Sequence, residues 1–273
     1  MRYVDTRHLP RLAQVDLLDE AAAEISGLAD AEQRSAYIDG RSNLWRNLRT
    51  ALWGLGNCKC WFSEAIVQHQ EGHVEHYRPK KKVATTAHSG YWWDAFDWKN
   101  FRFAHPTVNL RVTDYLTGQL AGKGTYFPLR NQDARANSKA EEIHEEPVLL
   151  DPARASDCRL LCFDSANGRA RPRFSEDEDA WKHRRAQASI DYYHLNEPTW
   201  TVHRKDLMDE VAAICDAAIA IKSGVPLDAN AYETCLARLV ERIGPMSEFS
   251  AAAYQVIREK GLIEQLFPLP SSD

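Results

Sequence analysis

The sequence predicts an α+β protein in which a few short strands are embedded in a mainly helical chain. Apolar residues recur at helical spacing near both ends of the 273 residues, and strand-like patterns are confined to short stretches between residues 57 and 173. A content of 44% hydrophobic residues, with eight tryptophans and ten tyrosines, supplies enough apolar surface for a packed core. One enlarged domain, or a core with appendages, is therefore expected.

The N-terminal elements are predicted to be helices. Residues 15–55 show helical spacing with a turn near residues 27–30, which indicates two helices, and Gly54 and Gly56 are expected to end the second. The next stretch, residues 57–80, suggests a two-stranded element formed by Trp61–Phe62 and His73–Tyr77. We take residues 1–56 as an N-terminal helical segment.

The middle and C-terminal elements follow from the same patterns. Residues 83–90 are read as a loop, 105–120 as a helix, 130–146 as a charged surface loop and 147–152 as a short buried strand. A hairpin turning at Asn167-Gly168 should follow. Residues 57–195 form the predicted central core, and residues 196–273 a C-terminal helical region. The helices in this part of the chain are expected near 177–194, 201–222, 228–243 and 246–265.

Composition narrows the classes of protein. A net charge of −5 and a pI of about 6.1 argue against binding nucleic acid by bulk charge, so a nucleic-acid enzyme would need a local basic patch. Six cysteines without an apolar signal segment favour reduced thiols and a cytoplasmic location. No run of about twenty apolar residues is present, which argues against a membrane span.

Four residues carry the chemistry that the sequence predicts. Glu75 and His76 are adjacent on a strand-like stretch that stops at Pro79, and Asn100 and Asn109 follow. A neutral histidine can take a proton from water, an amide can orient the imidazole, and oxygen donors suit Mg²⁺. A strand pair followed by a helix would bring these groups together as a metal cup. The sequence thus favours a metal-dependent nuclease.

This set resembles the His-Asn-Asn version of the HNH nuclease motif, whose fold is the ββα-metal finger. The phrases VEHYRPK, GYWWDAFDWKNF, KGTYFPL, EPVLLDP and RLLCFDSANGRARP look like HNH proteins of Septu and retron-associated antiphage systems, over residues 57–195. The resemblance implies an endonuclease effector that depends on Mg²⁺ or Mn²⁺. It also implies an ATPase partner of the ABC or SMC-like kind, and nucleic acid as substrate, with DNA favoured over RNA.

Residue roles carry over position by position. The resemblance implies that His76 is the general base, that Asn100 positions it, and that Glu75 and Asn109 are metal ligands. The basic run that abuts the pair is expected to contact backbone phosphates, and Lys123 matches a family lysine near the phosphate path, with a solvated loop lysine as the alternative. These expected nucleic-acid contacts are Arg78, Lys80, Lys81, Lys82 and Lys123.

The chain departs from the family at its zinc site. Many members carry two Cys-x-x-Cys pairs for a structural zinc, but the matching positions here are Cys60 with Ser63 and His105 with Val108. Serine and valine do not supply the ligands that zinc needs, so a structural zinc is not expected and aromatic packing should replace it. The alternative is a rebuilt zinc site. Its ligands would be Cys58, Cys60, His69 and His73.

Two rival functions remain open on the sequence. One is a degenerate HNH fold that binds nucleic acid or a partner without cutting, which the altered zinc positions favour. The other is a metal hydrolase of other substrates that uses His69, His73 and His76 as a cluster. The first is tested by cleavage assays, and the second requires the three imidazoles to converge.

Overall fold

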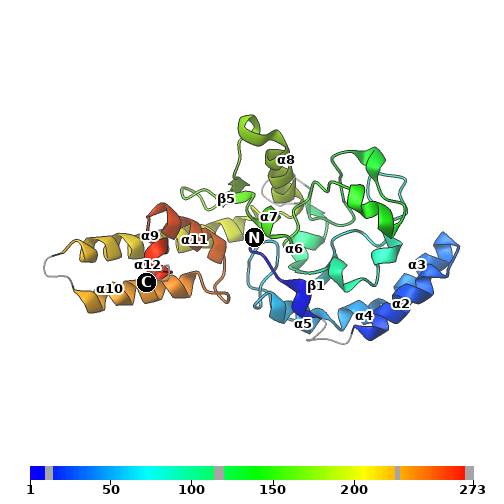
Figure 1. Ribbon diagram of the computed structural model, residues 1–273, viewed down its shortest axis with the longest axis horizontal. Coiled ribbons are helices and arrows are strands. Elements are labelled where there is room, and N and C mark those ends of the chain that lie inside the picture. The colour runs from blue at the N-terminus through cyan, green and yellow to red at the C-terminus, as the bar shows by residue number, and fades with distance from the viewer. Residues whose placement is uncertain (10–14, 114–119, 225–227, 268–273) are drawn as a thin grey trace, which may run out of the picture.

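The computed structural model describes residues 1–9, 15–113, 120–224 and 228–267 and confirms the α+β class. Helices dominate both ends, and three separate two-stranded antiparallel sheets lie between them (Figure 1). The α-helices of the described residues are α2 (Asp16–Ser26), α3 (Ala31–Gly40), α4 (Ser42–Arg46), α5 (Arg49–Leu55), α6 (Pro106–Asn109), α7 (Ala155–Cys158), α8 (Glu176–Tyr192), α9 (Pro198–Lys222), α10 (Ala229–Arg242), α11 (Ser250–Glu259) and α12 (Ile263–Leu266).

The sheets are short hairpins. Strand β1 (His73–His76) pairs with β2 (Phe101–Ala104), β3 (Val112–Thr113) with β4 (Leu120–Ala121), and β5 (Leu161–Phe163) with β6 (Ala170–Pro172). The β5–β6 hairpin confirms the one predicted around Asn167-Gly168, and Gly168 has a φ of +70° that suits the turn. Short 3₁₀ helices occupy the N-terminus and several connections. They are Thr6–His8, Trp92–Asp94, Trp98–Asn100, Gln132–Ala134 and Lys139–His144.

Four expectations about elements are wrong. The second N-terminal helix that the sequence predicts is divided into three helices, α3, α4 and α5. Trp61–Phe62 is a turn and not a strand, because the chain reverses between Cys60 and Ala65, whose N–H and carbonyl bond at 2.9 Å. Residues 147–152 are buried but contribute one isolated bridge, Leu129 to Pro147.

The fourth concerns the helix predicted over residues 105–120. The helix begins at Pro106 under a cap from His105 and ends at Asn109, because Leu110 is already extended and the chain turns into β3. Gly122 requires this path, since a Cβ there would meet the carbonyl oxygen of Leu110 at 1.8 Å. The rest of the predicted helix, residues 114–119, lies outside the described residues.

Capping explains why the C-terminal helices begin where they do. Ser175 and Glu178 form a capping box at the start of α8, Glu197 accepts from the backbone of α9, and Asp228 does the same for α10. Predicted and observed helices agree in number and place except at the last, which divides into α11 and α12. No helix among the described residues is long and apolar enough to cross a membrane.

The buried apolar side chains form one cluster that reaches from α2 to α11. Helices α4 and α5 contact β1, α5 also contacts β2, and α9 packs on α10 and α11. In Figure 1 the C-terminal helices gather at one end of the molecule and α2 to α4 at the other, with the β1–β2 hairpin between them. The hairpin is thus held from outside by helices, which fixes the position of the residues it carries.

Candidate active site

The β1–β2 hairpin places Glu75 and His76 at the end of a strand. His76 lies opposite Phe101 and Glu75 opposite Arg102 in the register, and the ladder extends one bond further, from the N–H of Tyr77 to the carbonyl of Asn100 at 2.9 Å. Neighbouring residues on a strand face opposite sides. The pair is therefore divided between the two faces of the hairpin.

His76 is buried and its imidazole orientation is fixed. One nitrogen, Nε2, lies 3.0 Å from the carbonyl oxygen of Ala95, and since a carbonyl only accepts, this nitrogen carries the proton. The other nitrogen, Nδ1, is then an acceptor. It faces the ammonium of Lys80 at 3.3 Å. Burial, and then the charge of Lys80, holds the pKa of His76 well below its usual value.

Asn100 closes the loop that presents the Ala95 carbonyl. Its Oδ1 accepts from the N–H of Arg78 at 2.7 Å, and its Nδ2 donates to the carbonyl oxygens of Arg78 and Asp94 at 2.9 and 3.2 Å. The amide thereby extends the hairpin by one rung beyond the backbone ladder. Because Asp94 precedes Ala95, Asn100 acts on His76 through the backbone and not by direct contact.

Glu75 is buried and paired with Lys123. The ammonium of Lys123, which has no exposed surface, donates to Glu75 Oε1 at 2.6 Å and to the carbonyl oxygen of His76 at 3.0 Å. The backbone of Lys123 is bonded to the carbonyl of Val108 in α6. The second oxygen of Glu75 has no hydrogen-bond partner among the described residues. One carboxylate oxygen is thus engaged and one is available.

Asn109 ends α6 beside the same hairpin. Its Nδ2 lies 3.4 Å from Nδ1 of His73, which shares a face of β1 with Glu75 because the two are two residues apart. Asn109 and His73 line a cleft of about 500 Å³. The cleft is also lined by Asp39, Ser42, Trp45, Arg46, Arg49, Gly72, Val74 and Lys80.

Two cleft residues cover the imidazole of His76. Trp45 meets its ring edge to face with centroids 5.2 Å apart, and Lys80 contacts Nδ1 while lying 5.0 Å from the Trp45 ring. Phe101 packs on the imidazole as well, with ring centroids 4.9 Å apart. Access of water to Nδ1 from the cleft therefore depends on the position of Lys80.

The structure separates the five expected nucleic-acid contacts. Lys80 lines the cleft, Lys82 is exposed, and Lys81 pairs with Asp39. Arg78 and Lys123 are buried, and each is paired with a carboxylate of the chain. Their role as phosphate contacts stays a prediction.

Arg78 is held by the acidic segment 130–146, which the sequence predicts to be a surface loop. Its guanidinium bonds to Glu145 at 3.0 and 3.1 Å, and the carboxylates of Glu142 and Glu145 raise the pKa of Arg78 despite burial. Glu145 also accepts from Tyr91. Residues 130–146 contain seven other Asp, Glu, Lys and Arg residues, and a single buried carboxylate among them leaves no periodic signal in the sequence.

Arg46 and Arg49 are the cleft cations that the sequence analysis missed. Arg46 is exposed on α4, and Arg49 begins α5 with one guanidinium nitrogen 3.4 Å from the carbonyl of Gln70. A spacing of three residues places both near one side of a helical stretch, which is the signal that could have found them. With Lys80 they give the cleft three cations against one carboxylate, Asp39.

The histidines and cysteines do not converge. His69 bonds to Thr50, His73 to Asn109 and His76 to Ala95, so the three imidazoles point to different partners. Among residues the structure describes, no group of three or more His, Cys, Asp or Glu side chains is placed to hold a metal ion. Neither the rebuilt zinc site nor the three-histidine hydrolase finds its ligand set here.

Apolar packing surrounds the turn before β1. Trp61 is buried, its N–H donates to the carbonyl of Phe103, and its indole donates to Leu52 in α5. Phe62 packs on Tyr193 with ring centroids 4.4 Å apart. This contact ties the turn before β1 to the end of α8.

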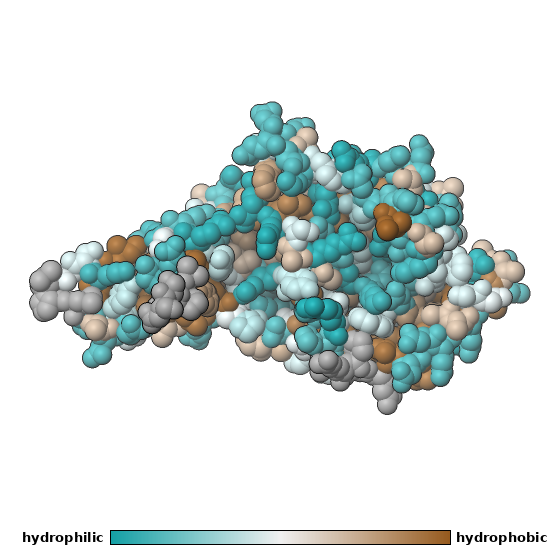
Figure 2. All heavy atoms as spheres, viewed as in Figure 1, coloured by the Kyte–Doolittle hydropathy of each residue, from teal (hydrophilic) through white to brown (hydrophobic). Residues whose placement is uncertain are grey.

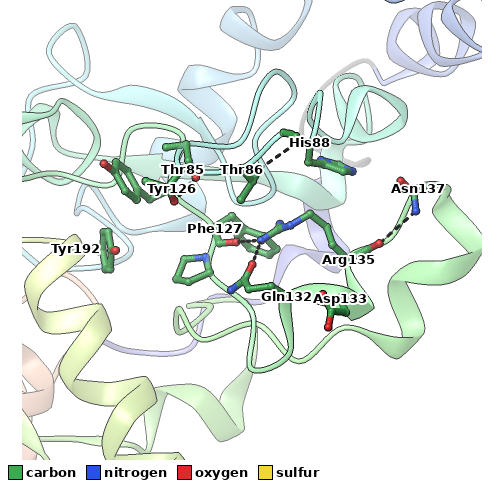
Figure 3. Close-up of a pocket in the computed structure, with 13 residues that line it drawn as sticks. Thr85, Thr86, His88, Tyr126, Phe127, Gln132, Asp133, Arg135, Asn137 and Tyr192 are labelled. Carbon is green, nitrogen blue, oxygen red and sulfur yellow. Dashed lines mark hydrogen bonds between the residues drawn. The ribbon is translucent and has the colours of Figure 1, made fainter.

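A second cavity lies on the far side of the loop that follows β1. It has a volume of about 660 Å³ and is lined by residues 84–88, 126–128 and 132–137 together with Tyr192 (Figure 3). Arg135 bridges its floor, donating to the carbonyl of Phe127 and to Gln132. It contains none of the predicted site residues, and its cation is already bonded within the chain.

The fold and site define an α+β protein with a buried acid and base on one strand and a basic cleft beside them. No family model matches the chain. Over 176 residues it is 27% identical to the Septu protein PtuB of Bacillus mycoides (strain KBAB4), in a match that covers 62% of this chain. The chain spans about half the length of that curated relative, 50%. The likeness supports a distant relationship to a Septu protein.

Proposed function

We propose that this chain is a metal-dependent HNH endonuclease whose β1–β2 hairpin and helix α6 act as a ββα-metal finger. The observation that carries the proposal is the imidazole of His76, whose protonated nitrogen is fixed on the Ala95 carbonyl so that the other nitrogen is a base. The acid, the two asparagine amides and the basic cleft that lie near this imidazole support a catalytic role for it.

Each residue has a distinct task in the proposed reaction. His76 takes the proton of the attacking water at Nδ1. Asn100 is a positioning residue, because its amide holds the carbonyl of Asp94 and thereby the Ala95 carbonyl that orients His76. Arg46, Arg49 and Lys80 bind the phosphate backbone in the cleft.

The donors of Glu75 and Asn109 fit a hard divalent cation such as Mg²⁺ or Mn²⁺. They offer a carboxylate oxygen without a partner and an amide oxygen on the same side of the hairpin. When bound, such an ion would polarise the phosphate and stabilise the leaving oxygen. Lys123 would share Glu75 with it, since the ammonium occupies one oxygen only.

Lys80 would couple substrate binding to the base. In the structure its ammonium donates to Nδ1 of His76, which occupies the lone pair that must accept the proton of water. A phosphate in the cleft offers a charged acceptor, and charged acceptors bind ammonium more strongly than a neutral imidazole does. Binding of the backbone would thus draw Lys80 away and release Nδ1.

The proposed setting is bacterial antiphage defence, with an ATPase partner of the ABC or SMC-like kind. The distant Septu relative supports the setting. The C-terminal helices support a partner surface, because six of the eleven exposed large apolar side chains lie there and hydrophobic residues gather over these helices in Figure 2. The six are Val202, Ile219, Val240, Met246, Tyr254 and Phe267.

Cleavage assays test the proposal. The chain, alone and copurified with its genomic neighbours, is incubated with supercoiled plasmid, single-stranded DNA and RNA in Mg²⁺ or Mn²⁺. His76→Ala should abolish cutting, whereas the matched control His203→Ala, an exposed histidine on α9, should retain it. Equal cleavage by wild type and His76→Ala, or no cleavage by any preparation, would refute the nuclease proposal.

A nucleic-acid-binding or partner-binding protein that does not cut is the second candidate. The burial of His76 and the pairing of Glu75 with Lys123 favour it, because both groups are satisfied within the chain. Under this alternative the same assays show binding to nucleic acid, or capture of the ATPase, without cleavage in either metal.

A further inference from the structure

A second, larger groove lies where the N-terminus, the β5–β6 hairpin and α11 meet in Figure 1. Its volume is about 870 Å³, and its lining shares no residue with the cleft beside His76. Its lining residues come from the N-terminus, α7 and the chain that leads from it into β5, the segment after β6, α8 and α11. Nothing in the proposed nuclease reaction uses it.

The groove is basic. Of its seventeen lining residues five are cations and none is acidic, although acids outnumber bases in the chain by 39 to 34. Arg159 and Arg258 are exposed and pair with no acid that the structure describes. The Nε of Arg173 is buried without a hydrogen-bond partner. Arg2 and Lys182 complete the five.

Aromatic rings line the groove together with these cations. Tyr3 and Tyr254 are 46% and 39% exposed, far above what packed rings show, while Phe163 and Phe174 are half-buried in the groove. Lys182 already lies 4.7 Å from the Phe174 ring. A positively charged groove that also presents exposed rings is the arrangement on which proteins stack unpaired bases while binding their phosphates.

We propose that this groove binds single-stranded nucleic acid. Phosphates would lie on Arg159, Arg173 and Arg258, and bases would stack on Tyr3 and Tyr254. A duplex would use the guanidiniums but not the rings, since its bases are stacked inside. An acidic peptide would likewise need only the charges, which makes it the alternative that the experiment must separate.

Groove binding would give the protein a second hold on its substrate. A strand seated here is retained whether or not the cleft holds a phosphodiester. The inference therefore goes beyond the proposed nuclease and does not depend on cutting. It predicts that affinity for single strands persists in EDTA, where metal-dependent cleavage stops.

The test measures binding of the full chain to a labelled oligo-dT of about twelve nucleotides, by fluorescence anisotropy in EDTA. Arg159→Glu/Arg258→Glu should weaken binding at least about tenfold and lower the salt slope by about 1.4, which is two contacts at about 0.7 each. Tyr254→Ala should weaken it about fivefold at unchanged charge. Thermal melts verify that each variant folds.

The matched control is Arg169→Glu/Arg184→Glu, which changes the same charge at two exposed residues outside the groove. If the control weakens binding as much as the groove variant, bulk charge explains the affinity and the groove proposal fails. If polyglutamate competes as well as oligo-dT and Tyr254→Ala has no effect, the groove binds acidic peptide instead. If the wild-type protein binds oligo-dT but does not cut plasmid, the nuclease proposal fails and the groove proposal stands.

Discussion

Replacing Lys123 by methionine isolates the buried pair that Glu75 makes. Methionine is close to lysine in length, so the change removes the ammonium without opening a large cavity. It leaves the Glu75 carboxylate, 8% exposed, without the 2.6 Å bond that the ammonium donates. Breaking a buried ion pair from one side costs about 3–5 kcal/mol. For a chain of this size that lowers Tm by roughly 6–20 °C.

The double variant Glu75→Gln/Lys123→Met is the control. It removes both charges together, so most of the stability lost in Lys123→Met should return. Melting curves of the three proteins, measured by circular dichroism, give the comparison. Wild-type stability in Lys123→Met, or a double variant no more stable than the single one, would refute the view that Glu75 is charged and dependent on Lys123.

Divalent cations extend the same experiment to the proposed metal site. In Lys123→Met both oxygens of Glu75 are free, so 10 mM Mg²⁺ should raise Tm more than it does in the double variant. With a Kd near 1 mM the gain is about 1.4 kcal/mol. Equal effects of Mg²⁺ on the single and double variants would remove Glu75 from the ligand set while leaving its pairing with Lys123 intact.

Three further predictions follow from buried polar groups. Asn100→Ala removes three hydrogen bonds at the loop closure, so we expect cleavage to fall at least about 100-fold and unfolding free energy by about 1–3 kcal/mol, measured by plasmid nicking and urea titration; unchanged cleavage would contradict its positioning role. Burial and the adjacent Glu142 raise the pKa of Asp94 from 3.8 to about 7, outweighing Lys139. The folded state then binds the proton more tightly than the unfolded state, so stability should fall as pH rises from about 4 to 7, by at most about 1.4 kcal/mol per pH unit, and level off above. Urea titrations at several pH values should show that the unfolding free energy of Asp94→Asn depends less on pH than that of wild type. The same pH dependence in both proteins would contradict a raised pKa of Asp94. Arg102→Leu removes the buried partner of Asp151 and two 2.7 Å bonds, so the unfolding free energy should drop by about 3–5 kcal/mol, and a drop under about 1 kcal/mol would show that water or Arg154 compensates the carboxylate.

Segments with periodic apolar residues could be predicted from the sequence, whereas segments without such a period, which fold through long-range contacts, could not. The C-terminal helices follow from apolar periodicity and from caps such as Ser175 and Asp228. Strand β1 was predicted, but its partner was not, because the pairing of His73–His76 with Phe101–Ala104 spans a loop whose closure depends on a side chain, Asn100. Long-range pairing of this kind leaves no local signal.

The candidate site shows the same division. Adjacent Glu75 and His76, with the two asparagines, were found from the sequence, and their catalytic roles stay predictions. The partner of Arg78 was missed because burial of Glu145 depends on how an unpatterned segment folds back. A lysine or arginine beside a motif looks the same in sequence whether it faces solvent or a carboxylate, and only the fold separates Lys80 from Lys123.

The closure of the loop after β1 has a consequence for how such a protein can diversify. Residues 81–90 lie within two closures of the loop, the Asn100 amide on Arg78 and the bond from the N–H of Tyr91 to the carbonyl of Pro79 at 2.8 Å. Within this stretch Val83 is buried and Gly90 has no room for a side chain, whereas Lys82, Ala87 and Ser89 are exposed. The exposed positions can therefore vary, by evolution or by design, without moving the Ala95 carbonyl that orients His76.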